Sequence, residues 1–226
     1  MVAHRMTSVL TKIDLSDVRQ IVEIGSWHLG QSVEFANLFK EAIIDAFEPV
    51  PDSFALCKKI WSEQDDQKKQ RIRVHNLAIS DKEGEIPFYA IEPNISNQID
   101  EGYSSMFKFL DVVTVDGVAA PLLQKEIMVK TIRLDSWCDE NKVTAVDILW
   151  IDAQGAELLV LQGAEKILAQ TKIIMTEVGL KPYYDGHTLK KDIDQYLFEL
   201  GFKLLEDSFE MNIPEYEANV IYVRNI

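Results

Sequence analysis

The sequence predicts an α/β fold built on a doubly wound, mostly parallel sheet of seven strands with helices on both faces. Short apolar runs alternate with segments of helical periodicity over residues 21–79 and again over 146–223, which is typical of βαβ units. The last two runs, 202–207 and 219–223, are close enough in sequence to pair antiparallel. We therefore expect an antiparallel final strand in an otherwise parallel sheet.

The first three strands are expected to alternate with two helices. The run Ile21-Val22-Glu23-Ile24-Gly25 is typical of a buried strand that stops at a glycine. The expected elements are strands at 21–25, 42–47 and 71–79, with helices at 30–40 and from residue 52 onward.

Residues 80–130 interrupt this alternation and are interpreted as a small insertion beside the main sheet. Turn-forming residues at 81–84 precede an alternating run at 85–91 that is typical of a half-exposed strand. Together with an N-terminal extension at 1–19, the insertion is expected to belong to a single domain over 1–226.

The α/β rhythm returns after the insertion. A continuous apolar run near residue 150 predicts a buried strand, and the segments that follow have helical periodicity. The expected elements are helices at 136–141, 156–169 and 187–200, and strands at 146–151 and 172–178.

Composition and charge exclude several classes of protein. The 23 Lys and Arg against 37 Asp and Glu give a net charge of −14, which argues against a surface that follows nucleic-acid phosphates. No stretch approaches the roughly 18 apolar residues of a membrane span, and no apolar leader is apparent. Cys57 and Cys138 lack metal-site or C-x-x-C spacing, so a reducing compartment is expected. We expect a cytoplasmic protein without nucleic-acid or membrane partners.

Acidic residues lie at or near the carboxyl ends of four predicted strands. They are Glu23, Glu48, Asp152 and Glu177. Ligands bind at this edge of a doubly wound sheet. One such acid is commonly a helix cap, but four at one crevice favour a functional site.

The first strand is followed by a loop that resembles a phosphate-binding loop without matching it. Gly25 and Gly30 bracket a turn into a helix, and Ser32 fits the last position of G-x-x-x-x-G-K-[ST]. Gln31 stands where the phosphate-binding lysine is required. A nucleoside without a phosphate chain therefore fits this loop better than a nucleotide.

Glu48 supports a nucleoside ligand. It lies 23 residues after Gly25, close to the roughly 20-residue offset of an acid that hydrogen-bonds a ribose diol. A carboxylate at this position would also repel a 2′-phosphate. The alternative is a solvent-facing acid at a strand end.

Six short motifs occur in the order found in FkbM-type methyltransferases, which the sequence resembles over roughly residues 20–205. The most specific are Phe47-Glu48-Pro49-Val50-Pro51 and Ile151-Asp152-Ala153-Gln154-Gly155-Ala156-Glu157. The others are Ile21-Val22-Glu23-Ile24-Gly25, Asn76-Leu77-Ala78-Ile79-Ser80, Leu134-Asp135-Ser136-Trp137 and Thr176-Glu177-Val178.

This resemblance implies a class I, Rossmann-like methyltransferase that uses S-adenosylmethionine to methylate a hydroxyl of a sugar, glycan or related natural product. The insertion would then shape the acceptor pocket. The implied cofactor contacts are Glu23, Gly25, Ser26 and Gly30 on the methionine side, Glu48 with Pro49 at the ribose, Ala78 and Ile79 at the adenine, and Ser104, Ser105, Asp152 and Ala153 nearby.

The sequence departs from the family pattern in two places. Glu23 replaces the Asp that opens the first loop, and Ser26-Trp27-His28 replaces its Ala-Asn-x segment. Gln154 stands where the family usually has Glu. Neither change removes the glycines or the predicted ribose acid.

Asp152 is the predicted general base for methyl transfer to an alcohol, with Glu177 second. Asp152 could instead cap the next helix or contact the cofactor's amine. A Mg²⁺ ion between two carboxylates is a further alternative, but no third ligand is apparent and no metal site is expected. His187 is a third candidate for catalysis, and His28 could contact the substrate or only pack on Trp27.

Two other functions stay open at the level of sequence. One is a nucleotide-binding protein with a degenerate phosphate loop, and the other is a non-catalytic binding module that keeps the fold. The acceptor's identity and the oligomeric state cannot be read from the residues.

Overall fold

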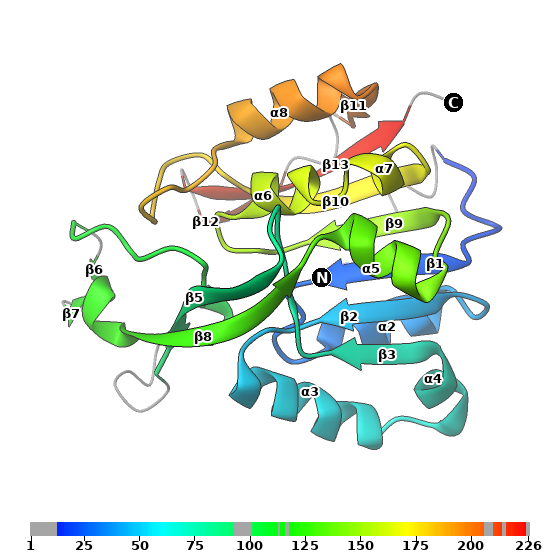
Figure 1. Cartoon of the computed structure of the whole chain (residues 1–226). Coiled ribbons are helices and arrows are strands. Elements are labelled where there is room, and N and C mark those ends of the chain that lie inside the picture. Colours follow the sequence, from blue (N-terminus) through cyan, green and yellow to red (C-terminus); the bar gives the residue numbers. More distant parts are fainter. Residues whose placement is uncertain are drawn as a thin grey trace.

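The main sheet of the computed structural model confirms the predicted fold. The structure describes residues 13–92, 101–112, 114–115, 118–205, 210–213 and 216–224. The strands of the sheet are β1 (Gln20–Ile24), β2 (Ile43–Phe47), β3 (Ile72–His75), β9 (Val146–Ile151), β10 (Thr171–Gly179), β11 (Phe202–Leu204), β12 (Glu210–Ile213) and β13 (Glu217–Arg224). They follow the order β11-β13-β10-β9-β1-β2-β3, and β12 pairs with β13 as well (Figure 1).

Strand directions place five carboxyl ends on one edge. β1 pairs in parallel with β2 and β9, β2 with β3, and β9 with β10, whereas β13 runs antiparallel to β10 and β11. The parallel strands therefore all end at the same edge of the sheet, which we call the carboxyl edge. Ligands bind at this edge in folds of this type.

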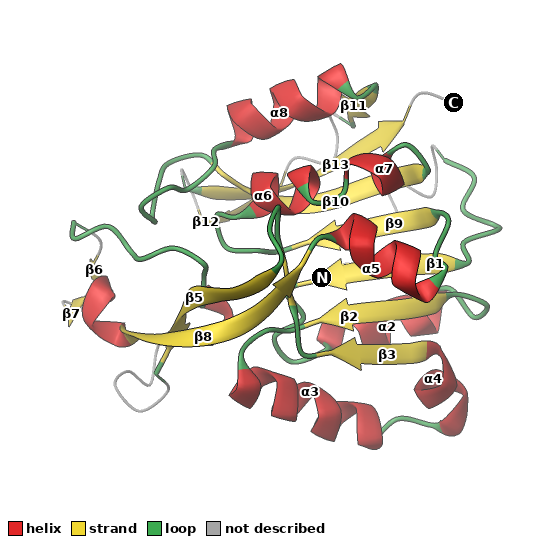
Figure 2. Ribbon diagram, viewed as in Figure 1, coloured by secondary structure: helices red, strands yellow, loops and turns green. Residues whose placement is uncertain are grey.

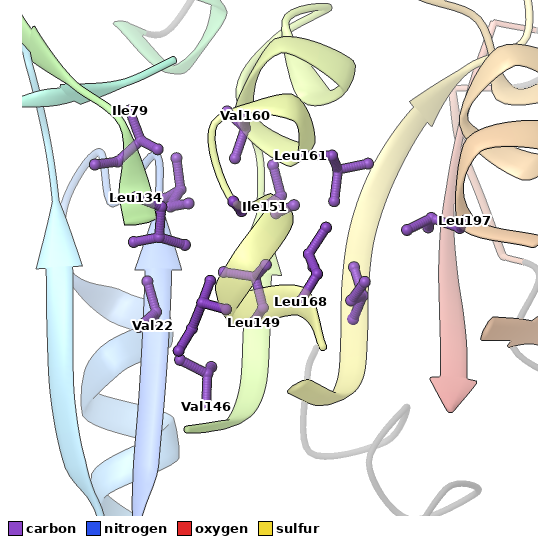
Figure 3. Close-up of a cluster of buried hydrophobic side chains, with 14 of the residues drawn as sticks. Val22, Ile79, Leu134, Val146, Leu149, Ile151, Val160, Leu161, Leu168 and Leu197 are labelled. Carbon is purple, nitrogen blue, oxygen red and sulfur yellow. The ribbon is translucent and has the colours of Figure 1, made fainter. Parts of the chain in front are cut away.

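Helices cover both faces of the sheet (Figure 2). Val22 and Ile24 of β1 pack in a buried cluster with residues from the helices of one face (Figure 3), whereas Ile21 packs with residues of the opposite face. The first face carries α5 (Leu134–Asn141), α6 (Glu157–Gln162), α7 (Glu165–Leu168) and α8 (Lys190–Glu199). The second carries α2 (Gly30–Leu38) and α3 (Pro51–Ser62), and α4 (Asp66–Arg71) leads into β3.

The predicted helix at 156–169 is interrupted, and distant residues explain the break. α6 ends before Gly163, where a Cβ atom would lie 2.1 Å from the Ser80 carbonyl oxygen. The buried Asp135 carboxylate accepts the N–H groups of Lys166 and Ile167 at 2.9–3.1 Å and caps the start of α7. The chain therefore forms two short helices in place of one.

The predicted strand at 71–79 is also divided, because the chain leaves the main sheet after His75. The Asn76 side-chain amide donates to the carbonyls of Glu48 at 2.8 Å and Pro49 at 3.0 Å. The next strand is β4 (Ala78–Ile79), which pairs in parallel with β8 (Gln124–Ile132) of a second sheet.

The insertion forms this second sheet. β5 (Gly84–Ile91) pairs antiparallel with β8, and a small hairpin joins β6 (Thr114–Val115) to β7 (Val118–Ala119). β5 and β8 project beyond the carboxyl edge of the main sheet (Figure 1). The insertion is therefore placed beside the edge where a ligand would bind.

The helices of the structure are short. Within the part of the chain that the structure describes, none has both the length and the apolar character needed to cross a membrane.

Candidate active site

A cleft opens at the carboxyl edge, where β1, β2 and β9 end next to the insertion. It encloses about 620 Å³ of empty space, part of it open to solvent. Both the main sheet and the insertion contribute to its walls. The lining residues are Ile24, Gly25, Trp27, Phe47, Glu48, Pro49, Val50, Leu77, Ala78, Ile79, Phe88, Gly102, Ser104, Met106, Asp152 and Ala153.

Gly25 allows the ends of β1 and β9 to meet at the floor of the cleft. Its φ angle is +84°, and a Cβ atom there would lie 1.8 Å from the Asp152 carbonyl oxygen. The Asp152 N–H donates to the Ile24 carbonyl at 2.9 Å. Any other residue at position 25 would have to push β9, and with it Asp152, out of place.

Glu48 is held in the cleft by backbone donors. Its Oε2 accepts the Trp27 N–H at 2.8 Å, and its Oε1 accepts the Val50 N–H at 2.9 Å. The residue is only 5% exposed and lines the cleft. Each carboxylate oxygen can accept more than one hydrogen bond, so the fixed carboxylate suits a pair of ribose hydroxyls, as the sequence predicts.

The loop after β1 is not arranged to hold phosphates. Phosphate loops bind through backbone N–H groups that point at the ligand. Here the N–H groups of Gly25 and Ser26 donate to the Phe47 carbonyl at 3.0 and 3.1 Å. The Gly30 N–H donates to His28 Nδ1 at 3.1 Å. The loop amides are thus used within the protein, and the degenerate phosphate-loop alternative loses support.

The cleft that Glu48 lines also has an apolar wall. Ala78 and Ile79 both line it, as the sequence predicts for the adenine side. The wall is completed by Phe88 and Met106 of the insertion, which sequence reasoning did not identify. An apolar wall and a fixed carboxylate in one cleft suit a nucleoside, whose base is flat and whose ribose carries hydroxyl donors.

The two neighbouring serines of the insertion have different surroundings. Ser104 lines the cleft and its hydroxyl accepts the Ile91 N–H at 3.0 Å. Ser105 is fully buried, donates to the Gln154 carbonyl at 2.7 Å and accepts the Phe107 N–H at 3.0 Å. The structure thus brings Ser104 to the cleft, while Ser105 joins the insertion to the loop after β9.

Three of the predicted methionine-side residues lie behind the cleft wall. Glu23 is buried and accepts the Ser32 hydroxyl, and burial raises its pKa to about 8. The Ser26 hydroxyl donates to the Phe47 carbonyl at 3.2 Å. Gly30 lies under the His28 ring, which packs on Trp27 at a centroid distance of 4.0 Å. These residues shape the loop and are not among those that line the cleft.

Asp152 and Glu177 are brought together by Gln154, which sequence reasoning treated only as a departure from the family pattern. Gln154 Nε2 donates to Asp152 Oδ1 and to Glu177 Oε2, both at 2.8 Å. Asp152 lines the cleft, whereas Glu177 is not among the lining residues and is joined to Asp152 through this amide. The N-cap residue of α6 is Ala156 and not Asp152, and the N–H groups of Ala153 and Gly155 are accepted by Glu157.

His187 lies outside the cleft lining. Its ring packs close to Gly155 and Gly179, and its Nδ1 accepts the Tyr183 N–H at 3.1 Å. Burial lowers its pKa to about 4, so the ring is neutral at ordinary pH. The structure gives His187 a packing role beside the loop and does not bring it to the predicted site.

Two further acids near Asp152 were not predicted from the sequence. Burial raises the pKa of Glu157 to about 8, with a smaller contribution from Asp152. Burial and then Asp152 raise the pKa of Glu217 to about 7. Glu157 belongs to a recognised motif and could have been proposed, whereas Glu217 lies on β13 and no local signal marks it. Acids with raised pKa values gather at functional sites.

Among the described residues, no group of three or more His, Cys, Asp or Glu side chains is placed to hold a metal ion.

Known proteins resemble this chain in sequence and in structure. The methyltransferase FkbM domain family matches residues 21–204. The chain is 31% identical over 192 residues to the 2-O-methyltransferase NoeI of Sinorhizobium fredii, covering 82% of this chain and 72% of that protein.

Two solved methyltransferases share the fold. Magnesium protoporphyrin IX methyltransferase from Synechocystis PCC 6803, with bound S-adenosylmethionine, has a TM-score of 0.50 at 11% identity, covering 99% of this chain and 81% of that one. A putative tRNA methyltransferase from Streptococcus pneumoniae, in complex with S-adenosylmethionine, has a TM-score of 0.51 at 13% identity, covering 98% and 72%. With a cleft of suitable form at the carboxyl edge, the chain therefore belongs to the FkbM family of S-adenosylmethionine-dependent methyltransferases.

Proposed function

We propose that the protein is an O-methyltransferase that acts on a hydroxyl of a sugar, a glycan or a related natural product. The observation that carries this proposal is the position of Asp152, which lines the cofactor cleft while Gln154 fixes its carboxylate at 2.8 Å. A fixed carboxylate beside the cofactor suits an acceptor that must lose a proton as it reacts. The relative NoeI is itself a 2-O-methyltransferase.

The cofactor would lie between Glu48 and the apolar wall of Ala78 and Ile79. When bound, S-adenosylmethionine supplies an activated methyl group on a sulfonium. Glu48 would accept hydrogen bonds from the ribose hydroxyls, and the apolar wall would pack on the adenine. Gly25 keeps the backbone at the end of β1 close to Asp152.

Asp152 would act on the acceptor. Its carboxylate would accept the proton of the acceptor hydroxyl while the hydroxyl oxygen attacks the methyl carbon in line with the departing sulfur. Glu177 would support it through the shared Gln154 amide. Holding both reactants in line is expected to contribute more to the rate than the base alone, because the reaction is a direct displacement.

The acceptor is proposed to be a small molecule or a glycan. The net charge of −14 disfavours a nucleic acid. The insertion borders the cleft through Phe88, Gly102, Ser104 and Met106, and we propose that it shapes the acceptor pocket. Cys57 and Cys138 are free and buried, which supports a cytoplasmic location.

The test is incubation with isotope-labelled S-adenosylmethionine and a panel of glycans and hydroxylated small molecules, followed by mass spectrometry. The expected product gains one labelled methyl group on an oxygen, and the Asp152→Asn variant forms far less of it. Methyl transfer only to nitrogen or carbon would overturn the proposal. Cofactor binding without transfer to any member of the panel would favour the non-catalytic module.

A further inference from the structure

Gln154 has an unusual backbone conformation and a fully engaged side chain. Its φ angle is +49°, which is uncommon for a residue other than glycine. The two protons of its Nε2 go to two different carboxylates, Asp152 and Glu177, each at 2.8 Å. Carboxylates only accept hydrogen bonds, so the amide nitrogen and not its oxygen must face them.

The remaining polar atoms of Gln154 join it to the insertion. Its Oε1 lies 3.0 Å from the Tyr184 hydroxyl, which also lies 3.1 Å from the Tyr103 carbonyl, and its backbone carbonyl accepts the Ser105 hydroxyl at 2.7 Å. Tyr184 is 1% exposed and stacks on Phe109 at a centroid distance of 4.6 Å. With ionised carboxylates as the partners of Nε2, the amide has one orientation, and its two donors point at Asp152 and Glu177.

We propose that Gln154 is a positioning residue whose amide clamps the Asp152 and Glu177 carboxylates side by side in their ionised form. The inference rests on the proposed function, in which Asp152 is the base. Two neighbouring carboxylates repel each other, and one then tends to keep its proton. A donor shared between them opposes that tendency, because a hydrogen bond to the charged form favours it. Asp152 is thereby available to accept a proton.

The surroundings make this donor important, because the described titratable groups around the clamp are acids, phenols and one neutral imidazole. An amide at position 154 adds donors without adding charge, whereas a carboxylate there would add a third negative group. The acids and phenols are Glu23 of β1, Glu157 of α6, Glu217 of β13, and Tyr183 and Tyr184 before α8. The imidazole is His187, which packs against Gly155 and is neutral at ordinary pH because burial lowers its pKa to about 4.

Thermal unfolding of the Gln154→Glu variant at pH 5 and pH 8 tests the clamp without any acceptor. With three neighbouring carboxylates, the folded state holds protons that the unfolded chain releases near pH 4–5, so folding becomes less favourable as pH rises. We expect the Tm deficit relative to the parent protein to be roughly 2–6 °C larger at pH 8 than at pH 5.

Tyr184→Phe is the matched control. It removes a hydrogen bond from the neutral end of the same amide, and burial holds the pKa of Tyr184 well above its usual range. Its Tm deficit should therefore be the same at both pH values. A Gln154→Glu deficit that is equally independent of pH would overturn the clamp, since loss of packing alone has no pH dependence.

A double variant separates the clamp from the base assignment. Asp152→Asn combined with Gln154→Glu removes one carboxylate, so the pH-dependent part of the deficit should shrink. If it does not shrink, Asp152 is not part of the clamp. If it shrinks but Asp152→Asn alone keeps parental turnover on an acceptor from the panel, the clamp stands and the base assignment fails.

Discussion

Acidic side chains at the two edges of the main sheet have opposite surroundings. At the opposite edge, where the parallel strands begin and which we call the amino edge, burial opposes ionisation of Asp147. Its pKa is nevertheless lowered by Lys172, whose Nζ lies 2.6 Å away, and by the N–H groups of Arg19 and Gln20 at 2.7 and 2.9 Å. At the carboxyl edge, burial raises the pKa of Glu23 to about 8, and the Ser32 hydroxyl only partly offsets it.

The difference shows where the protein gives up stability for function. An acid that is paired and hydrogen-bonded, like Asp147, stabilises the folded state at neutral pH. A buried acid with a raised pKa, like Glu23 or Glu157, reduces that stability as it ionises. Costly acids are retained where chemistry needs them, and here Glu23 and Glu157 lie close enough to Asp152, at the carboxyl edge, for its charge to raise their pKa values further.

The largest expected effect is on turnover by Asp152→Asn at the carboxyl edge. The amide keeps the shape of the side chain but removes the basic oxygen, so turnover on an acceptor from the panel should fall by about 10²–10⁴-fold. Affinity for S-adenosylhomocysteine, measured by calorimetry, should change little. If instead the variant binds S-adenosylhomocysteine more weakly but keeps the parental turnover at saturating cofactor, Asp152 contacts the cofactor's amine. Loss of parental activity with EDTA would point to a metal.

The next effect is on stability and depends on pH. Glu23→Gln removes a group whose folded-state pKa is about 8, well above the unfolded value near 4.3. Because the pKa of Glu23 is raised, this residue does not reduce the parent's free energy of unfolding below about pH 4. Its ionisation reduces that free energy progressively as the pH rises toward 8. The variant should therefore gain up to about 5 kcal/mol in unfolding free energy near pH 8 relative to pH 4, since one pKa unit corresponds to about 1.4 kcal/mol. Urea unfolding at pH 4 and pH 8 measures the gain, and an equal effect at both would contradict it.

Glu48→Ala tests whether the cofactor uses the carboxyl edge. Loss of the carboxylate should weaken binding of S-adenosylhomocysteine by about 1.5–3 kcal/mol, the scale of hydrogen bonds to a charged group. Calorimetry on the folded variant measures it, and Glu41→Ala, at an exposed position before β2, is the control. An unchanged dissociation constant would remove Glu48 from the ribose site.

Asp147→Asn at the amino edge should have the smallest of these effects. The amide keeps an acceptor for the Arg19 and Gln20 N–H groups but loses its charge toward Lys172. We expect a loss of about 1–2 kcal/mol in unfolding free energy at pH 7. The lowered pKa of Asp147 means that the parent loses this contribution as pH falls, so the difference should narrow near pH 3.

The main sheet could be predicted from sequence because its strands are buried on both faces. Every residue of β9 is buried, and such a strand appears as a continuous apolar run. The division of the strand at 71–79 and of the helix at 156–169 could not be predicted. Each depends on contacts of one side chain, Asn76 or Asp135, with a segment far away in the chain.

The same limit applies to the candidate site. Some residues were predicted both from a motif and from their position at a strand end. Of these, Gly25, Glu48 and Asp152 line the cleft. The resemblance implied both Ser104 and Ser105, and of the two Ser104 lines the cleft while Ser105 donates to the Gln154 carbonyl. Phe88 and Met106 were missed because the insertion has no periodic pattern that points to a ligand. The bridging role of Gln154 depends on geometry that no spacing reveals.

The most direct test of the difference between the two edges is to measure Asp147→Asn and Asp152→Asn side by side. Unfolding free energy and turnover per folded molecule are determined for each variant. Asp147→Asn should lose stability and keep parental turnover, whereas Asp152→Asn should keep stability and lose turnover by about 10²–10⁴-fold. If both variants lost the same property, or if Asp152→Asn kept its turnover, the assignment of chemistry to the carboxyl edge would be contradicted.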